Sequence, residues 1–408
     1  MREMKDSGIA WIGTIPQDWQ LSKIGNLYTQ RNEKVSDKDY QPLSVTMQGI
    51  LPQLATAAKT DDGDNRKLVR VGDFAINSRS DRRGSCGISP LDGSVSLINI
   101  ILTPRTAMHP GYYNWLFHTT LLADEFYKWG HGIVADLWTT RWQEMKSISV
   151  PVPEYAEQER IAAFLDAECA EIDAVLEKTR ASIEECKKLK QAVITQAVTK
   201  GIRGDRPMKD SGIEWIGDIP AEWRKTQLRH CATIKAGITL GKKYEKADNL
   251  VERPYLRVAN VQGGYVDLSI LTTIEVTKDE DLKYRLCDGD VLMTEGGDRD
   301  KLGRGCVWHG EIEPCLHQNH IFAVQTRKDT LLPEFLKYLT ASDVGRLYFD
   351  VTAIKTTNLA CTSSSKVLAF TIPLPSVEEQ VEIVESLKTK CVGIEALITK
   401  KQQYLTEI

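Results

Sequence analysis

The chain lacks the features that mark membrane, secreted or metal-binding proteins. Its 408 residues contain no apolar run near the roughly 18 residues that a membrane span needs. Its nine cysteines include no C-x-x-C pair, and the N-terminus shows no charged-then-apolar signal pattern. We therefore expect reduced thiols, no membrane association and a cytoplasmic location. The 42% hydrophobic content is enough for folded cores, and the length predicts about two to three domains.

Motifs that catalysis would require are also missing. A methyltransferase would need a glycine-rich cofactor loop and an Asn/Asp-Pro-Pro-aromatic stretch, and neither occurs. The stretch "AGITLGKKY" resembles a phosphate-binding loop, but its spacing is one residue short, and Lys243 replaces the Ser or Thr that would hold magnesium. Asp267 with Asp281 and Lys283 matches a nuclease triad only through common residue types. These absences favour a binding protein over an enzyme.

One stretch, "CVWHGEIEPCLHQNH", is rich in thiols and imidazoles that could bind zinc. Its spacing matches no standard zinc finger, and the following "NHIFAVQ" alternates as a strand does. We therefore favour packed thiols and strand histidines over a metal site. The residues concerned are Cys306, His309, Cys315, His317 and His320.

The most informative feature is a pair of repeats. "MKDSGIAWIGTIPQDW" begins at Met4 and recurs as "MKDSGIEWIGDIPAEW" at Met208, with twelve of sixteen positions identical. "PVPEYAEQERIAAFLDAECAEIDAVLEK" begins at Pro151 and recurs at Pro373 with ten of 28 positions identical. Repeats of this length indicate an internal duplication into two domain-sized halves. The repeated segments form a frame, and the unlike segments between them are what the frame holds.

The second repeat predicts long helices. No Gly or Pro occurs from Gln158 to Thr199, and apolar residues follow the alternating 4,3 spacing of a heptad seam. Because one long helix cannot bury its own seam, two matching seams favour an intramolecular antiparallel coiled coil. The alternative is that each helix packs on its own domain. The predicted interface comprises Leu165, Cys169, Ile172, Leu176 and Ile183 in the first copy, and Leu387, Cys391, Ile394, Ile398 and Leu405 in the second.

We therefore predict an α+β fold with pseudo-two-fold internal duplication. Residues 1–150 and 208–372 form two globular domains of mixed helix and strand, residues 151–207 a central helical region with a linker, and residues 373–408 a C-terminal helical region. Lys and Arg nearly balance Asp and Glu in both globular domains. The helical segments are acidic, with seven basic against ten acidic residues in 154–200 and four against six in 373–408.

Basic residues beside hydroxyl and amide side chains occur in turn-rich stretches of both globular domains. This mixture of residues binds phosphates and base edges. A solvated surface is the simpler explanation for any single cluster, but two framed domains that both carry such loops favour nucleic acid. The candidates are Arg79, Ser80, Arg82, Arg83, Thr139, Thr140 and Arg141 in the first domain, and Lys235, Lys242, Lys243, Tyr244, Arg299, Lys301, Arg304, Lys355, Thr356, Thr357 and Asn358 in the second.

The pattern of motifs resembles the DNA-specificity subunit of type I restriction–modification systems. Each half opens with "SGIxWIGxIPxxW" and closes with "PxPxxxEQxxI" followed by a long helix, and the resemblance covers essentially the whole chain. It implies that each variable segment is a target-recognition domain and that the frame is the conserved region. We expect Trp11, Ile12, Ile15, Pro16 and Trp19 to be packing residues that dock each recognition domain onto the helical frame.

The resemblance further implies a non-catalytic subunit that binds double-stranded DNA and two modification subunits, with restriction/motor subunits added in the full complex. S-adenosylmethionine, ATP and magnesium would sit on those partners, and no cofactor is expected in this chain. Two unlike recognition domains on one rigid spacer would read a bipartite, asymmetric target. Since the helices are acidic, we expect the isolated chain to bind DNA weakly.

Two other functions remain open from the residues alone. The first is a non-catalytic coiled-coil scaffold whose two domains bind ligands other than DNA. The second, less favoured by the missing motifs, is a nuclease or a methyltransferase.

Overall fold

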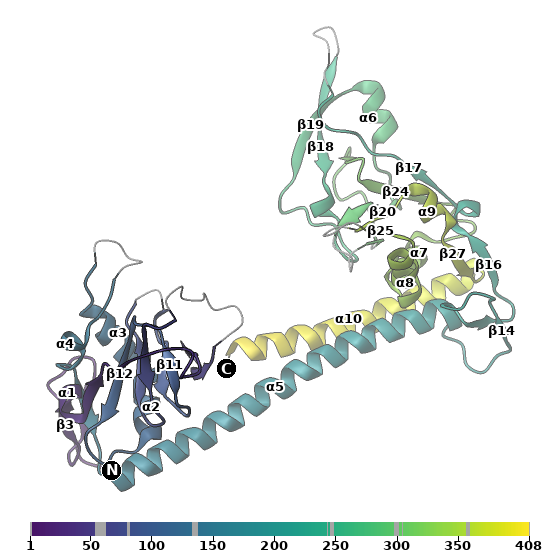
Figure 1. Cartoon of the computed structure of the whole chain (residues 1–408). Helices are drawn as coiled ribbons and strands as arrows, with labels where there is room; N and C mark the ends of the chain where they lie inside the picture. The colour runs from purple at the N-terminus through teal and green to yellow at the C-terminus, as the bar shows by residue number, and fades with distance from the viewer. Residues whose placement is uncertain are drawn as a thin grey trace. The chain divides into compact units, whose positions relative to one another are not determined.

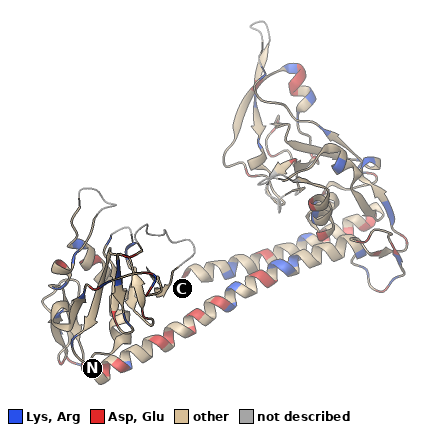
Figure 2. Cartoon of the chain, viewed as in Figure 1, with Lys and Arg blue, Asp and Glu red and all other residues tan. Residues whose placement is uncertain are grey.

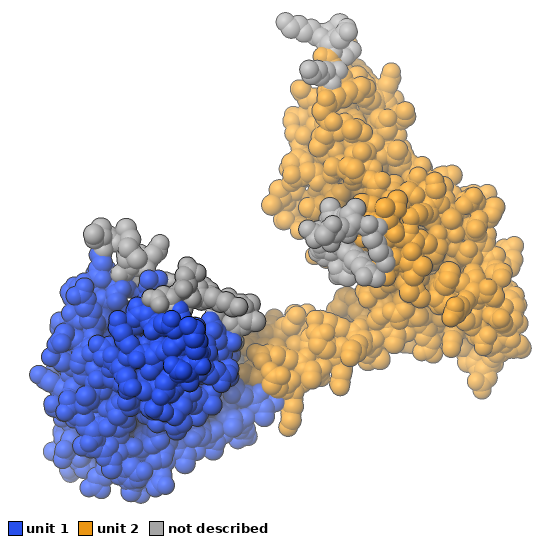
Figure 3. Space-filling model, in the orientation of Figure 1, with its two compact units in different colours: residues 1–175 blue, residues 176–408 orange. Residues whose placement is uncertain are grey.

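The chain divides into two compact units, Met1–Val175 and Leu176–Ile408 (Figure 3). The computed structural model describes residues 2–53, 63–79, 82–132, 138–242, 244, 249–297, 302–303, 305–355 and 360–407. The border between the units lies inside one helix, α5 (Tyr155–Lys200). The expected helical region 151–207 is therefore shared by the two units.

In the first unit, helices pack on a four-stranded antiparallel sheet of order β10-β9-β12-β4, beside smaller sheets (Figure 1). The elements before α5 are β1 (Met4–Asp6), β2 (Thr14–Pro16), β3 (Gln20–Lys23), α1 (Ile24–Leu27), β4 (Tyr28–Arg31), β5 (Lys34–Val35), β6 (Leu43–Thr46), β7 (Gly49–Pro52), β8 (Arg66–Val69), β9 (Phe74–Asn77), β10 (Cys86–Ile88), β11 (Gly93–Val95), β12 (Asn99–Pro104), α2 (Pro110–His118), α3 (Thr120–Lys128), α4 (Trp142–Met145) and β13 (Ser149–Val152).

The second unit repeats this architecture with a four-stranded sheet of order β22-β20-β24-β17. Its elements are β14 (Met208–Asp210), β15 (Asp218–Pro220), β16 (Arg224–Gln227), η3 (Leu228–His230), β17 (Ala232–Lys235), β18 (Leu250–Leu256), η4 (Val258–Asn260), β19 (Thr272–Thr277), α6 (Lys278–Tyr284), β20 (Val291–Thr294), β21 (Gly296–Gly297), β22 (Gly305–Val307), β23 (Leu316–His317), β24 (Ile321–Thr326), α7 (Pro333–Ala341), α8 (Asp343–Thr352), β25 (Ile354–Lys355), β26 (Ala360–Cys361), α9 (Ser364–Ala369), β27 (Thr371–Leu374) and α10 (Val377–Glu407).

The variable segment of each unit begins and ends in two strands that pair with each other. In the first unit β3 pairs antiparallel with β13, and in the second β16 pairs antiparallel with β27. The opening repeat forms the hairpins β1–β2 and β14–β15. The helix of the closing repeat follows directly after β13 or β27. The sequence duplication is therefore a structural duplication.

Both long helices form where the sequence predicts them. Helix α5 contains 46 residues and ends before Gly201, whose φ of +76° suits a glycine at a helix end. Within the second unit, Ile194 and Val198 of α5 share an apolar core with Ile383 and Leu387 of α10. None of the described helices is long and apolar enough to cross a membrane.

The contacts between α5 and α10 in the second unit run antiparallel. Lys190 pairs with Glu395, while Arg203, just after α5, pairs with Glu382. Residue numbers therefore increase along α5 and its linker while the numbers of their partners decrease along α10. Ion pairs and the shared core thus join the helices over this stretch, and a coiled coil along their full length stays a prediction.

The predicted seam residues differ in burial. Ile183, Leu387 and Cys391 are buried, and Ile172 is 45% exposed. The other six, Leu165, Cys169, Leu176, Ile394, Ile398 and Leu405, are half-buried. Further along α5, Ile194 and Val198 are also buried, although they are not among the predicted interface residues.

Candidate nucleic-acid interface

One glutamate at the start of each long helix binds the tryptophan that ends the opening motif. Trp19 Nε1 donates a hydrogen bond to Glu157 Oε2 at 3.0 Å, and Trp223 Nε1 donates to Glu379 Oε2 at 2.9 Å. These contacts confirm that the opening motif docks its domain on the frame. The tryptophan and glutamate of this contact are 138 residues apart in the first unit. Both residues are repeated in the second unit, where they form the equivalent hydrogen bond.

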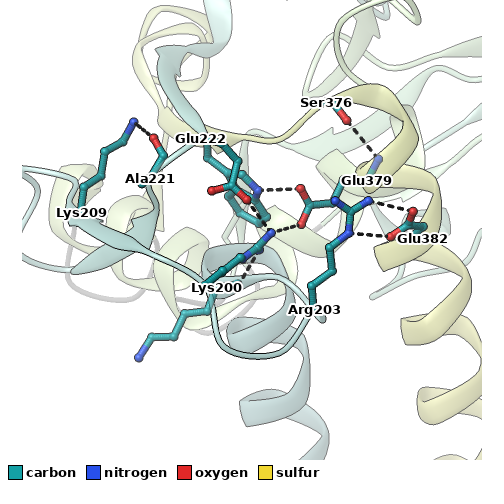
Figure 4. A network of polar contacts seen from close by, with 10 residues as sticks. Lys200, Arg203, Lys209, Ala221, Glu222, Ser376, Glu379 and Glu382 are labelled. Carbon is teal, nitrogen blue, oxygen red and sulfur yellow. Dashed lines mark hydrogen bonds and ion pairs between the residues drawn. The ribbon is translucent and has the colours of Figure 1, made fainter.

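An arginine completes each of these contacts. Arg2 pairs with Glu157, and Arg206 Nη1 donates to Glu379 Oε1 at 2.6 Å. Figure 4 shows the second of these networks, in the linker after α5 and the start of α10. Arg206 donates a hydrogen bond to Glu379, and Arg203 donates one to the neighbouring Glu382. The side chain of Glu379 is 3% exposed. We call each set of arginine, tryptophan and glutamate a latch.

The glutamine that follows each latch glutamate holds a helix of the globular domain. Gln158 Oε1 accepts from the His109 N–H, where α2 begins, and Gln380 Oε1 accepts from the Leu332 N–H, where α7 begins. The first few N–H groups of a helix lack partners within it, so an outside acceptor stabilises that end. The Glu-Gln pair of the closing motif thus fixes both the opening hairpin and the first large helix of each domain.

In the first unit, three separated segments form a short ribbon that we call the first ribbon. Thr139 forms antiparallel bridges with both Arg79 and His131. The Thr140 N–H donates to the Ser78 carbonyl at 3.0 Å. The ribbon therefore brings together two of the predicted basic stretches, around Arg79 and around Thr139, which are about 60 residues apart in the sequence.

In the second unit, strands β21, β26 and β25 form an equivalent ribbon, the second ribbon. The Thr362 N–H donates to the Glu295 carbonyl at 2.7 Å, as Thr140 does to Ser78. This ribbon connects the stretch that leads into Arg299 with the stretch around Lys355. Each half of the chain therefore builds the same structure from the loops that the sequence marks as candidates.

Charged side chains line the first ribbon. Arg82 and Arg83 are exposed, and Arg83 pairs with Asp124 of α3. Arg141 is exposed, and its backbone N–H donates to Glu144 Oε2 at 3.1 Å. One expectation needs correction: Thr140 is fully buried and its hydroxyl donates to the Phe126 carbonyl, so its side chain supports the ribbon and does not face a ligand.

Three candidates of the second domain, Lys235, Lys242 and Tyr244, lie outside the strands of its ribbon. Lys242 pairs with Glu280 of α6, and Tyr244 Oη donates to Glu280 Oε2 at 2.9 Å. Burial alone would raise the pKa of Glu280, but hydrogen bonds from Lys242, Thr277 and Tyr244 outweigh it and lower the pKa to about 2. Lys235 is half-buried and donates to the Arg285 carbonyl at 2.6 Å, so its role is structural.

Several candidates fall outside the described residues. They are Ser80, Lys243, Arg299, Lys301, Arg304, Thr356, Thr357 and Asn358. Lys355 lies in β25. Lys243 lies between Lys242 and Tyr244, and the others lie in the sequence stretches that follow Arg79, Gly297 or Lys355.

The cysteine- and histidine-rich stretch forms part of a core. Cys306, Cys315 and His317 are buried, and burial raises the pKa of both thiols to about 12, which keeps them protonated and poor as metal ligands. His309 lies at the surface, where its Nε2 is 3.2 Å from Glu334 Oε1. Within the described part of the chain, no three His, Cys, Asp or Glu side chains gather to hold a metal ion.

Sequence reasoning missed two features beside the ribbons. Trp129, 48% exposed, follows α3 next to the first ribbon. His320 Nδ1 lies 2.5 Å from Glu295 Oε2 at the start of the second ribbon. The sequence marks His320 only as a possible zinc ligand, because an exposed tryptophan and a histidine–carboxylate pair become visible only when separate segments meet.

Known proteins match the chain over most of its length. The EcoKI specificity subunit of Escherichia coli K12 is 23% identical and covers 92% of this chain and 82% of its own length. The MjaVIII specificity subunit of Methanocaldococcus jannaschii is 24% identical, with 95% and 90% covered. The MjaX subunit of the same organism, described as a type I restriction enzyme specificity subunit, is 27% identical over 42% of this chain and 40% of its own length. No family model matches the chain.

Solved structures share the fold. A chain from a type I restriction–modification system, solved to explain complex assembly and conformational transition, covers 96% of this chain with a TM-score of 0.69 and 17% identity. The HsdS subunit from Thermoanaerobacter tengcongensis covers 96% with a TM-score of 0.52 and 16% identity. In sequence across most of its length, and in fold, the chain is a relative of the specificity subunits of type I restriction enzymes.

Proposed function

We propose that the chain is the DNA-specificity subunit of a type I restriction–modification complex. The observation that carries this proposal is the pair of equivalent ribbons, each held by an equivalent latch. Two domains of one architecture, presented in one way by a common frame, suit the reading of two DNA half-sites. The relatives are all named as specificity subunits, which agrees with a non-catalytic role.

The target is bipartite and asymmetric. The frames of the two halves are alike, but the ribbons differ: Arg82 and Arg83 follow the first strand of the first ribbon, whereas a glycine pair forms β21 in the second. Base edges in the major groove are distinguished by the pattern of donors, acceptors and methyl groups that a protein offers. Unlike ribbons therefore read unlike half-sites, and phosphate contacts from arginines such as Arg141 fix their register.

Helix α5 sets the distance between the half-sites. It begins in the first unit and ends in the second without a break. Its 46 residues correspond to about 69 Å at 1.5 Å per residue, which is about two turns of B-DNA. A helix that joins two reading domains converts protein length into spacer length.

Two modification subunits and the restriction/motor subunits complete the complex. They would carry S-adenosylmethionine, ATP and magnesium, and this chain would select the DNA target. The sequence contains no motif for binding these cofactors, and we therefore assign the chemistry to the partners.

The test is methylome sequencing of cells that carry this chain with its partner subunits. Replacing residues 20–150 by the segment of a related chain should change one half of the methylated target and leave the other half intact. The fold should tolerate the exchange because β3 and β13, at the ends of the segment, pair with each other.

Replacement of residues 224–372 is the matched control, and it should change the opposite half. A replacement that alters both halves would contradict one half-site per domain. A chain that binds no DNA in a gel shift with its partners present would favour the scaffold function instead.

A further inference from the structure

The charge of helix α5 is divided along its length. Residues 155–177 contain seven Asp or Glu and one Arg, whereas residues 178–200 contain six Lys or Arg and two Glu. Figure 2 shows acidic residues in the first half of α5 and basic residues toward its second half. The acidic total of the helices therefore conceals a basic half.

Helix α10 is divided in the same way. Residues 377–385 contain four Glu and no basic residue, whereas residues 386–401 contain four Lys and one Glu. Since Lys190 of α5 pairs with Glu395 of α10, the basic half of α5 meets the basic half of α10 within the second unit.

A cleft of about 750 Å³ lies where these basic halves meet the globular part of the second unit. Helices α5 and α10 form one side, and α7, α8 and the turn at Gly263–Tyr265 form the other. Its charged lining residues are Glu184, Lys187, Lys188, Lys190, Lys337, Arg346, Lys388 and Glu395.

The cleft is therefore strongly cationic, with six basic against two acidic residues. Lys187 pairs with Glu184, and Lys190 pairs with Glu395. Lys188 and Lys388 are exposed and have no ion pair or hydrogen bond with another described residue. Like charges gathered in a concave site raise its potential and attract anions.

The cleft is continuous with the second ribbon through helix α8. Arg346 faces the cleft from α8, and Ile354 begins the ribbon eight residues later. From Arg346 to the end of α8 at Thr352 the helix rises about 9 Å, which matches about three nucleotides at 3.4 Å per step. A strand read at the ribbon would place phosphates at the cleft a few nucleotides away.

We infer that this cleft binds the DNA sugar–phosphate backbone beside the half-site read by the second domain. The inference rests on the proposed function and extends it to the frame, which contributes sequence-independent affinity. An acidic protein segment would also match the charge, but the link to the second ribbon through α8 and the open space at Gly264, which allows close approach of a backbone, favour DNA.

The test compares two double variants of the full chain in complex with its partners. Lys188→Gln with Lys388→Gln removes two cleft charges, and Lys178→Gln with Lys400→Gln removes two exposed charges from the same helices outside the cleft. Fluorescence anisotropy is measured with a duplex that contains the target sequence found by methylome sequencing and with a scrambled duplex. Titrations at several salt concentrations give the affinity for DNA and its dependence on salt.

The cleft variant should bind both duplexes about tenfold more weakly, and its salt slope should fall by about 2, or about 1 for each phosphate contact. The control variant should stay close to the wild type. Wild-type discrimination between duplexes with an unchanged cleft variant would overturn this inference alone. A wild type that does not discriminate would overturn the proposed function. Loss of partner subunits with DNA affinity retained would assign the cleft to a protein and overturn the inference.

Discussion

At the scale of single residues, the two latches share chemistry but differ in their access to water. The side chains of Glu379 and Arg206 are 3% and 11% exposed, whereas those of Glu157 and Arg2 are 13% and 45% exposed. An ion pair gains strength as water is excluded, and removal of one partner then leaves an uncompensated buried charge. The equivalent residues therefore differ in their contribution to stability.

Glu379→Gln should lower the free energy of unfolding of the second unit by about 2 kcal/mol, because Arg206 would lose its buried carboxylate and keep its ion pair with Glu222, whose side chain is 54% exposed. Glu157→Gln, the matched change in the first unit, should cost about 1 kcal/mol or less, because Arg2 can turn to water or to Asp18. Urea unfolding followed by tryptophan fluorescence measures both. Equal losses would show that burial does not control the latch.

His317 gives the second unit a dependence on pH. It is fully buried, and burial lowers its pKa to about 4, because the loss of hydration outweighs the opposing backbone contacts at Lys235 and Tyr284. The unfolded chain, with a His pKa of about 6.5, takes up a proton that the folded chain refuses between these values. Stability should therefore fall as pH falls from about 6.5 to about 4, by at most about 3 kcal/mol.

His317→Leu should flatten this part of the stability profile, whatever its effect at neutral pH. His230→Gln, at an exposed histidine of the same unit, serves as the control and should leave the profile unchanged. Urea midpoints at pH 7, 5.5 and 4.5 give the slopes. An equally steep profile in His317→Leu would place the acid sensitivity elsewhere.

At the scale of elements, Gln380 joins helix α10 to helix α7. Its Nε2 donates to the Thr330 and Pro375 carbonyls, at 2.9 and 3.1 Å, and its Oε1 accepts from Leu332. Gln380→Leu should cost about 3 kcal/mol, because several buried backbone groups would lose their partners. Amide hydrogen exchange should show faster exchange at the start of α7. A change confined to α10 would argue against the connection.

The elements also show how far sequence reasoning reaches. The long helices follow from heptad spacing and, in α5, from the absence of Gly and Pro between Gln158 and Thr199; the expected bounds of α5 agree with the structure to within a few residues. The ribbons could not be predicted in the same way. β21, β25 and β26 have two residues each, too few to show a period, and their pairing depends on the core around Phe349 and Phe370.

The candidate residues show the same division. Residue type selected the stretches around Arg79 and Lys355, because loops with basic and hydroxyl side chains are chemically distinctive; the structure brings these stretches into the two ribbons, and their contact with DNA stays a prediction. It could not tell exposed Arg141 from buried Thr140, its neighbour. Nor could composition reveal that the acidic helices have basic halves, because a total carries no position.

At the scale of the whole molecule, the length of α5 should control the target. Insertion of seven residues after Leu176 adds about 10 Å of helix, close to three base pairs of DNA, and preserves the helical face to within about 20°. The methylated half-sites should keep their bases while the spacer between them changes. An unchanged spacer would exclude the role of α5 as a ruler.

The paired strands at the ends of each recognition segment have a genetic consequence. Because β3 with β13 and β16 with β27 bring the two ends of a segment side by side, any segment with compatible ends can occupy either frame. The frames are also the parts of the chain that are most alike. An exchange between frames would deliver an intact domain, and with it a new half of the proposed target, in one event.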